Sequence, residues 1–447
     1  MMGSKIPTFP IFLLDIIFVN MSLLIALFAP LDVVADKFNF VTYLPYVPWV
    51  SMATGFIFLM FNLYSNWIRK SIQDLILSIL LATLTLSAVT LVFSWIEPEF
   101  IVTSRAIMIG GIFQAVSITL SRSLIWVFNK KAYGAKRVLV IMRDLKEGSI
   151  LVEKILNHTK GWFTLVGLLP VNQLSEVEFK EIDIILINAN IPRKNEIVNL
   201  CVKFGKEILI VPELAELLLV CSEPQQVDDV LVLSIRPHDL DTRQLFFKRL
   251  FDIIAALILL VVFSPIMISL FIVIPLSTKG PALYKQERLG KNEIKYLIYK
   301  FRSMNLNAED HCGPILSEDQ DPRITKIGGF IRATRFDELP QLFNVLKGQM
   351  SLVGPRPERL YFINQFEEKI PHYSYRMSIK PGITGLAQVM GKYSTTAEDK
   401  LRLDMMYMHS YSFALDLKIL FQTIGVVLRR EQAGGVKDRR SKWPNSL

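Results

Sequence analysis

The chain has 447 residues, of which 51% are hydrophobic and 20% are charged, and its net charge is +9. This composition excludes a disordered protein, and a surplus so small and scattered gives no indication of a nucleic-acid partner. The charges are unevenly spread, because residues 1–128 carry only 12 charged side chains, about 9%, whereas the remainder has the proportion usual in soluble domains. The sequence therefore predicts about three units, the first in a membrane, and the +9 surplus fits a protein that lies against anionic lipid.

Residues 1–130 are predicted to form a transmembrane region of four helices. Four apolar runs, near residues 6–29, 44–67, 75–96 and 101–128, reach the roughly 20 residues that a spanning helix needs. Lysines and arginines follow the second and fourth runs, whereas acids predominate after the first and third, which predicts that the N-terminus and everything after Asn129 are cytoplasmic. Asp15 lies inside the first run, and we expect it to be neutral or paired with another helix.

Residues 131–241 are predicted to form an α/β Rossmann-like domain. Short apolar strands are expected at 138–142, 163–168, 182–187 and 208–211, with helices near 150–156, 194–204 and 214–220. This alternation favours a doubly wound parallel sheet. The turn after the first strand contains one glycine, Gly148, and the chain has no G-x-G-x-x-G, so no cofactor loop is evident.

A fifth apolar run, over residues 250–275, is interrupted by Ser264 and Pro265. A proline inside a helix removes a hydrogen bond and costs about 3 kcal/mol. Lysines and arginines lie on both sides of the run. This pattern favours a re-entrant helix that enters the cytoplasmic leaflet and returns. The alternative is a kinked fifth span, which would place residues 276–447 outside the cell.

An acidic pair, Asp337 and Glu338, precedes Pro340 and an apolar stripe at helical spacing that ends before Gly348. Pro340 belongs in a first helical turn, so the pair is predicted to lie at a helix N-terminus. An aspartate at this position often does no more than cap the helix. Two carboxylates together can also hold Mg²⁺, and an ionised aspartate can accept a phosphoryl group as a nucleophile.

Clustered cations surround this pair in the sequence. Gly354-Pro355-Arg356-Pro357 fixes one arginine between two prolines, which is either a rigid turn or a guanidinium held for phosphate. Four further cations are candidate phosphate-binding residues: Lys300, Arg302, Arg332 and Arg335. Phosphoryl transfer needs mainly positioning and charge neutralisation, which such cations supply together with Mg²⁺.

In this order, the motifs resemble those of the bacterial sugar transferase family, the polyprenyl-phosphate hexose-1-phosphate transferases. The resemblance covers about residues 243–436 and rests on Lys248-Arg249-x-x-Asp252, Ser264-Pro265, Lys300-Phe301-Arg302-Ser303-Met304, Asp337-Glu338-Leu339-Pro340-Gln341, Ser351-Leu352-Val353-Gly354-Pro355-Arg356-Pro357 and Lys380-Pro381-Gly382-Ile383-Thr384-Gly385. The four spans and the middle domain resemble the long form of the family. The expected architecture is thus a helical membrane region (1–130), a Rossmann-like domain (131–241), an α/β catalytic domain with a re-entrant helix (242–436) and a basic tail (437–447).

The resemblance implies a two-step exchange at the bacterial inner membrane, with the catalytic domain in the cytoplasm. Asp337 would attack a UDP-hexose and release UMP, and polyprenyl (undecaprenyl) phosphate would then take the phosphosugar, which initiates surface glycan synthesis. Glu338 would support the dyad and Mg²⁺, and Arg356 would grip phosphate. The oligomeric state is open, with a homodimer as one option, and the hexose is not identified.

Two departures from the family pattern imply an altered substrate preference. Met390-Gly391-Lys392 stands where Asn-Gly-Arg is common, and Lys lacks the bidentate fork of Arg. Gly329 and Ala333 fall where many members carry a basic residue.

Two other classes of protein remain open from the sequence. One is a membrane nucleotide-sugar dehydratase or epimerase, against which the missing glycine-rich loop argues. The other is a non-catalytic scaffold of a polysaccharide export complex, against which the intact Asp337-Glu338 pair argues.

Overall fold

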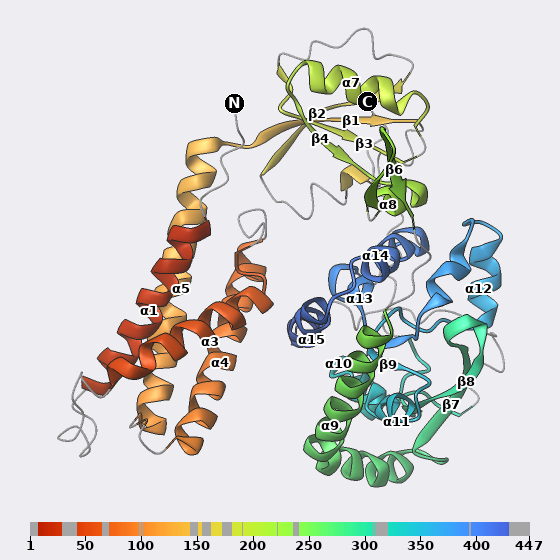
Figure 1. The fold of residues 1–447 in the computed structure, drawn as a ribbon. Coiled ribbons are helices and arrows are strands. Elements are labelled where there is room, and N and C mark those ends of the chain that lie inside the picture. Colours follow the sequence, from red (N-terminus) through yellow and green to blue (C-terminus); the bar gives the residue numbers. More distant parts are fainter. Residues whose placement is uncertain are drawn as a thin grey trace. The chain divides into compact units, whose positions relative to one another are not determined.

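The computed structural model describes residues 8–28, 43–64, 71–97, 100, 102–143, 151–153, 162–171, 181–189, 191–220, 222–235, 241–306, 308, 321–392 and 395–428. Its contacts divide the chain into two compact units, Met1–Glu213 and Leu214–Leu447. Figure 1 labels the elements of both units. The predicted basic tail and most of the helix expected at 150–156 lie outside the described residues.

The N-terminal part consists of four apolar helices, as predicted: α1 (Thr8–Phe28), α3 (Val47–Met60), α4 (Ile72–Ile96) and α5 (Ser104–Tyr133). Three of them, α1, α4 and α5, are long and apolar enough to cross a membrane, with mean hydropathies of 2.3, 2.4 and 1.4. The second predicted run instead starts with a short 3-10 helix (Leu44–Tyr46), and α3 itself has only 14 residues, about 21 Å at 1.5 Å per residue. It ends before Asn62, whose backbone adopts a left-handed conformation. These helices indicate a membrane protein.

Asp15 is paired with an arginine of another helix, which confirms one of the two expectations for it. Its Oδ2 lies 2.5 Å from Nη2 of Arg122 on α5, and both side chains are fully buried. The Arg122 guanidinium also lies 5.5 Å from the ring centroid of Tyr64. The pair therefore links the first and fourth apolar helices inside the bundle.

We expect Asp15→Leu to destabilise the protein by about 3–5 kcal/mol, because it leaves the Arg122 charge buried without its carboxylate. The double variant Asp15→Leu/Arg122→Met removes both charges and should recover most of that loss. Reversible unfolding in mixed detergent micelles measures the difference. Equal destabilisation in the single and double variants would show that burial of the unpaired arginine is not the cause.

The first unit also contains a four-stranded parallel sheet with strand order β2-β1-β3-β4. Its strands are β1 (Lys136–Met142), β2 (Phe163–Pro170), β3 (Ile184–Ile187) and β4 (Glu207–Ile210), which confirms the four predicted strands. Alternate residues of β1 and β3 enter two separate apolar clusters, so these central strands are buried on both faces. Helix α7 (Lys194–Lys203) packs Ile197 and Cys201 into one of these clusters.

The second unit begins with α8 (Leu214–Val220) and a hairpin of β5 (Glu223–Val227) and β6 (Val230–Ser234). The leucines of α8 pack on the core of the second unit, although the predicted middle domain extends to residue 241. The remaining elements are α9 (Thr242–Ser277), β7 (Leu283–Leu289), β8 (Lys295–Phe301), α10 (Lys326–Ala333), α11 (Gln341–Leu346), β9 (Ser351–Val353), α12 (Leu360–Glu367), β10 (Gly382–Thr384), α13 (Leu386–Met390), α14 (Ala397–His409) and α15 (Phe413–Leu428). Strands β7 and β8 pair antiparallel, and β9 and β10 pair parallel.

Helix α9 has 36 residues, a mean hydropathy of 3.0 and two internal prolines, Pro265 and Pro275. The predicted interruption at Ser264 and Pro265 is not a gap in the helix: Figure 1 shows one helix whose second part runs in a different direction from its first. Pro265 has no N–H for the carbonyl of Val261, and the Ser264 hydroxyl donates to that carbonyl instead, at 2.7 Å. The helix therefore bends with its exposed carbonyl satisfied.

Both ends of α9 pack on the same unit. Near its start, Ala256 enters the main core of the second unit, and near its end, Leu270 and Ile274 pack with Phe301 and Ile331. Both of these apolar clusters also contact Leu339. Leu259 and Leu260 before the bend and Ile266 and Met267 after it pack on the same two clusters, so one face of the helix follows the domain on both sides of the bend.

Three charged residues fix the start of α9. Lys248 donates to Asp416 Oδ2 at 2.6 Å, and Arg249 donates to the last carbonyls of α11, at 2.6 and 2.8 Å. Asp252 accepts hydrogen bonds from the hydroxyl of Ser351 and the backbone N–H of Leu352. The first motif of the family resemblance therefore anchors the membrane-seeking helix to the domain.

Candidate active site

The acidic pair lies on a 3-10 turn, Phe336–Glu338, between α10 and α11. Arg335 starts the turn with a left-handed backbone (φ 59°), and the N–H of Glu338 returns to the Arg335 carbonyl. Helix α11 begins only at Gln341, with Pro340 as its N-cap residue. The prediction that the acidic pair lies at the N-terminus of this helix is therefore wrong. Asp337 does not cap α11, so capping does not explain why an aspartate stands here.

Glu338 is the centre of a cluster of cations. Its Oε1 lies 2.8 Å from Arg356, 3.0 Å from Lys300 and 4.0 Å from Arg335. Only 9% of the Glu338 side chain is exposed. The structure thus brings together three cations that the sequence singled out, from β8, the turn and the loop after β9.

The two carboxyls have opposite electrostatic surroundings. Burial acts to raise the pKa of Glu338, but the positive charges of Arg356, Lys300 and Arg335 outweigh it and hold this pKa well below its usual range. Burial, and then the neighbouring Glu338 charge, raise the pKa of Asp337, while Lys300, Arg335 and Arg332 oppose that rise. The surroundings therefore favour the ionised form of Glu338 and disfavour the ionised form of Asp337.

Asp337 is also the carboxyl that is able to accept a new partner. Its Oδ1 is buried and has no hydrogen-bond partner within the described part of the chain. The same residues contain no cluster of three or more acidic, histidine or cysteine side chains for a metal. Mg²⁺ needs only one or two protein carboxylates when water and phosphate complete its shell. Asp337 Oδ1 fits such an ion, whereas Glu338 Oε1 is already surrounded by cations.

The other two predicted cations, Arg332 and Arg302, are not among the residues that contact Glu338 in the ion pairs above. Arg332 ends α10 close enough to Asp337 to act on its charge. Arg302 does not join the site: its buried guanidinium donates to the carbonyls of Thr278, Lys279 and Gly280 just after α9. It therefore stabilises the return of the chain from α9.

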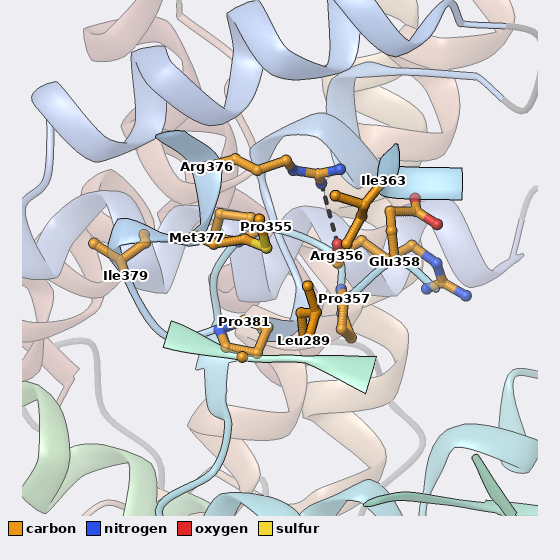
Figure 2. A pocket seen from close by; sticks show the side chains of 11 residues that line it. Leu289, Pro355, Arg356, Pro357, Glu358, Ile363, Arg376, Met377, Ile379 and Pro381 are labelled. Atoms are coloured by element: carbon orange, nitrogen blue, oxygen red, sulfur yellow. Dashed lines mark hydrogen bonds between the residues drawn. The ribbon is translucent and has the colours of Figure 1, made fainter. Parts of the chain in front are cut away.

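The loop that carries Arg356 packs backbone against backbone. A Cβ on Gly382 would lie 2.1 Å from the nitrogen of Gly354, and one on Gly385 would lie 2.2 Å from the Gly354 carbonyl. No side chain fits there, so the two glycine motifs exist to hold the β9 and β10 ends together. Figure 2 shows Arg356 in the small pocket beside this contact, with Arg376 reaching its carbonyl. No motif spacing marks Arg376 in the sequence, so its contact with the loop is visible only in the structure.

The family model described as bacterial sugar transferase matches residues 243–430. The chain is 47% identical over 186 residues to the UDP-N-acetylgalactosamine-undecaprenyl-phosphate N-acetylgalactosaminephosphotransferase of Aeromonas hydrophila, covering 41% of this chain and 44% of that protein. It is 30% identical over 312 residues to the UDP-glucose:undecaprenyl-phosphate glucose-1-phosphate transferase of Escherichia coli K12, covering 65% and 67%. It is 40% identical over 194 residues to the exopolysaccharide production protein PSS of Rhizobium leguminosarum bv. phaseoli, covering 42% and 97%.

The chain therefore belongs to the bacterial sugar transferase family, as its motifs predict. Its match spans about half the length of several of these curated relatives, including the Aeromonas protein. The acidic pair, its cations and the Arg356 loop all lie within the matched residues.

The surroundings of Asp337 predict a pH dependence if this carboxylate must be ionised to react. With the pKa of Asp337 raised, activity should fall on acidification at a higher pH than an ordinary aspartate would give. Lys300 lowers this pKa, so Lys300→Met should move the acidic limb of kcat/KM to still higher pH. Lys295→Met, an exposed lysine on the same strand, should leave the limb in place. A limb that Lys300→Met does not move, measured at saturating Mg²⁺, would exclude Asp337 as the titrating group.

Proposed function

We propose that this protein transfers a sugar 1-phosphate from a UDP-sugar to polyprenyl (undecaprenyl) phosphate and releases UMP, as the initiating step of surface glycan synthesis. The observation that carries the proposal is the buried Asp337, whose Oδ1 accepts no hydrogen bond from the described residues and which stands next to a glutamate surrounded by cations. The names of the relatives describe transfers of this kind, for N-acetylgalactosamine and for glucose.

In the first step, a carboxylate oxygen of Asp337 forms a bond to the phosphorus next to the sugar. The bond from that phosphorus to the bridging oxygen breaks, and UMP leaves with this oxygen. In the second step, an oxygen of the polyprenyl phosphate attacks the same phosphorus, and the Asp337 carboxylate is restored. Covalent catalysis of this kind divides one transfer between two bulky phosphates into two simpler displacements.

The cations supply the electrostatic part of the mechanism. Arg356, Lys300 and Arg335 lie where they can neutralise phosphate oxygens, and Glu338 holds them in place before the donor binds. Mg²⁺ held through Asp337, with Glu338 beside it, would neutralise the diphosphate further. Positive charges held in this way stabilise the phosphate through electrostatics.

The bend of α9 supports a re-entrant membrane helix. A straight helix of 36 residues would be about 54 Å long and would carry its end away from the domain. Instead, the helix packs on one unit near both of its ends and beside the bend, and its exposed part is strongly apolar. We propose that this part dips into the cytoplasmic leaflet of the bacterial inner membrane, where a soluble nucleotide and a lipid phosphate can meet at the site.

The reaction is tested by measuring UMP release from the purified full chain with undecaprenyl phosphate and Mg²⁺. The donor panel should include UDP-N-acetylgalactosamine, UDP-glucose and UDP-galactose. Release that depends on both the donor and the lipid supports the proposal. No release with any donor would favour a scaffold, and tightly bound NAD would favour a dehydratase or epimerase.

The topology is tested in intact cells with a membrane-impermeant thiol reagent, on a chain whose native cysteines are replaced. We expect Lys295→Cys in the catalytic domain to resist labelling, whereas Glu99→Cys, between α4 and α5, should react. Ready labelling at position 295 would mean that α9 crosses the membrane. A homodimer stays a prediction, which light scattering of the purified protein measures.

A further inference from the structure

The loop that carries Arg356 depends on other elements for its backbone hydrogen bonds. Two of the three residues in 355–357 are prolines, which have no N–H to donate. Each of the three carbonyls accepts from a different part of the domain: residue 355 from the Gly382 N–H at 2.9 Å, residue 356 from Arg376 at 3.1 Å and residue 357 from Arg288 at 3.3 Å. The position of the loop is therefore set from outside.

Arg376 is the more buried of the two side-chain donors. It lies on a 3-10 helix (Tyr373–Ser378), and its side chain is 4% exposed. Its guanidinium contacts Asp404 Oδ2 on α14 at 2.7 Å and the Tyr373 hydroxyl, besides the carbonyl of Arg356. Figure 2 shows its guanidinium directed at that carbonyl. Asp404, whose side chain is 2% exposed, balances the charge of Arg376, but it does not explain the contact of Arg376 with the Arg356 carbonyl.

A buried ion pair is rarely explained by stability alone, because apolar residues of similar volume are often at least as stable in its place. This pair does something that apolar residues do not: it presents a fixed, charged donor to the backbone of one residue. That residue sends its own side chain to Glu338 Oε1, at 2.8 Å. Arg356 is thereby held at both its carbonyl and its guanidinium.

We propose that the buried pair Arg376–Asp404 positions Arg356 for the phosphate of the donor. This role rests on the proposed function and adds to it two positioning residues that do not touch the reacting atoms. A guanidinium that is already oriented loses little freedom when phosphate binds, and misplacement of such a group by about 1 Å costs up to about 100-fold in rate.

The test is a double-mutant cycle for UMP release in the full chain. Arg376→Met alone leaves Asp404 without its partner and is prone to misfold, so the pair is removed as Arg376→Met/Asp404→Leu. We expect this variant to keep its thermal stability and to lose about 10- to 100-fold in kcat/KM, with KM for the UDP-sugar raised. Arg356→Ala should lose about 100- to 1000-fold, and adding the pair variant to it should change nothing more than about twofold.

Two further variants separate positioning from folding. Arg376→Lys keeps a charge beside Asp404 but has no planar fork, so it should fold normally and still be at least about fivefold slower. Arg402→Met removes another largely buried arginine of α14, one that pairs with Glu398 and Asp399 of its own helix, and should leave kcat/KM unchanged.

A wild-type level of kcat/KM in the pair variant, or an equal further loss on the Arg356→Ala background, would overturn the positioning role. A loss in kcat with KM unchanged and a lowered melting temperature would also overturn it, because that pattern reports less folded enzyme. A wild-type protein that releases no UMP from any donor would overturn the proposed function itself, and the positioning role with it.

Discussion

Asp337→Asn should abolish UMP release, with kcat lower by at least about 10⁴-fold, and should prevent any phosphosugar adduct. The amide has no nucleophilic oxygen comparable to the carboxylate, and removal of a covalent nucleophile is among the most damaging single changes in an enzyme. Steady-state UMP release and intact-protein mass spectrometry after incubation with the UDP-sugar measure the two effects.

The same substitution should leave the free energy of unfolding unchanged or slightly higher. Burial and the Glu338 charge both work against an ionised Asp337, and Oδ1 has no hydrogen bond to lose among the described residues. Asp399→Asn on α14 is the matched control, since this aspartate is ion-paired with Arg402 outside the acidic pair. Wild-type turnover in Asp337→Asn would remove Asp337 as the nucleophile, and a collapse of stability would show that it is mainly structural.

Glu338→Gln should lower both the free energy of unfolding and the activity. Its carboxylate lies within 4.0 Å of Lys300, Arg335 and Arg356, so neutralising it leaves these partly buried cations without that countercharge and should cost about 3 kcal/mol of stability. Activity should fall at least about 100-fold, because the cations then lose the geometry in which they meet phosphate.

Thermal unfolding and UMP release measure these effects side by side. Glu287→Gln makes the same chemical change in an exposed ion pair with Lys295 and should cost less than about 1 kcal/mol. Adding Lys300→Met to Glu338→Gln should recover part of the stability and none of the activity. A stable, fully active Glu338→Gln would contradict the assignment of Glu338 as the residue that organises the cations.

The sequence predicts well the helices, strands and site residues that depend only on neighbouring positions in the chain. Apolar runs predict the helices, alternation predicts the strands β1 to β4, and the adjacent Asp337 and Glu338 need no folding to be neighbours. The length of α3 was overestimated, because hydrophobicity continues past the left-handed turn at Asn62. The helix predicted at Asp337 starts at Gln341 because a 3-10 turn comes first.

The parts that it does not predict depend on long-range contacts. Arg302 is two residues from Lys300, which in a continued strand would put both on one face, but β8 ends at Phe301 and Arg302 turns to the end of α9. Arg376 and Asp404 are 28 residues apart, and Asp404 lies among charged residues of α14, where a solvent-facing role is the ordinary expectation. No spacing rule brings such pairs together before the domain folds.

The two-ended packing of α9 has a consequence for how the catalytic domain is attached to the bilayer. Its membrane-seeking segment is not an anchor joined by a linker, because residues at both of its ends belong to the hydrophobic core. If α9 enters the membrane as proposed, a protease that cuts between β6 and α9 would therefore not release the catalytic core into solution. The first four helices then become an accessory rather than the sole attachment. The Rhizobium relative, whose length is almost entirely covered by a 194-residue alignment, is of the size expected for the catalytic domain alone.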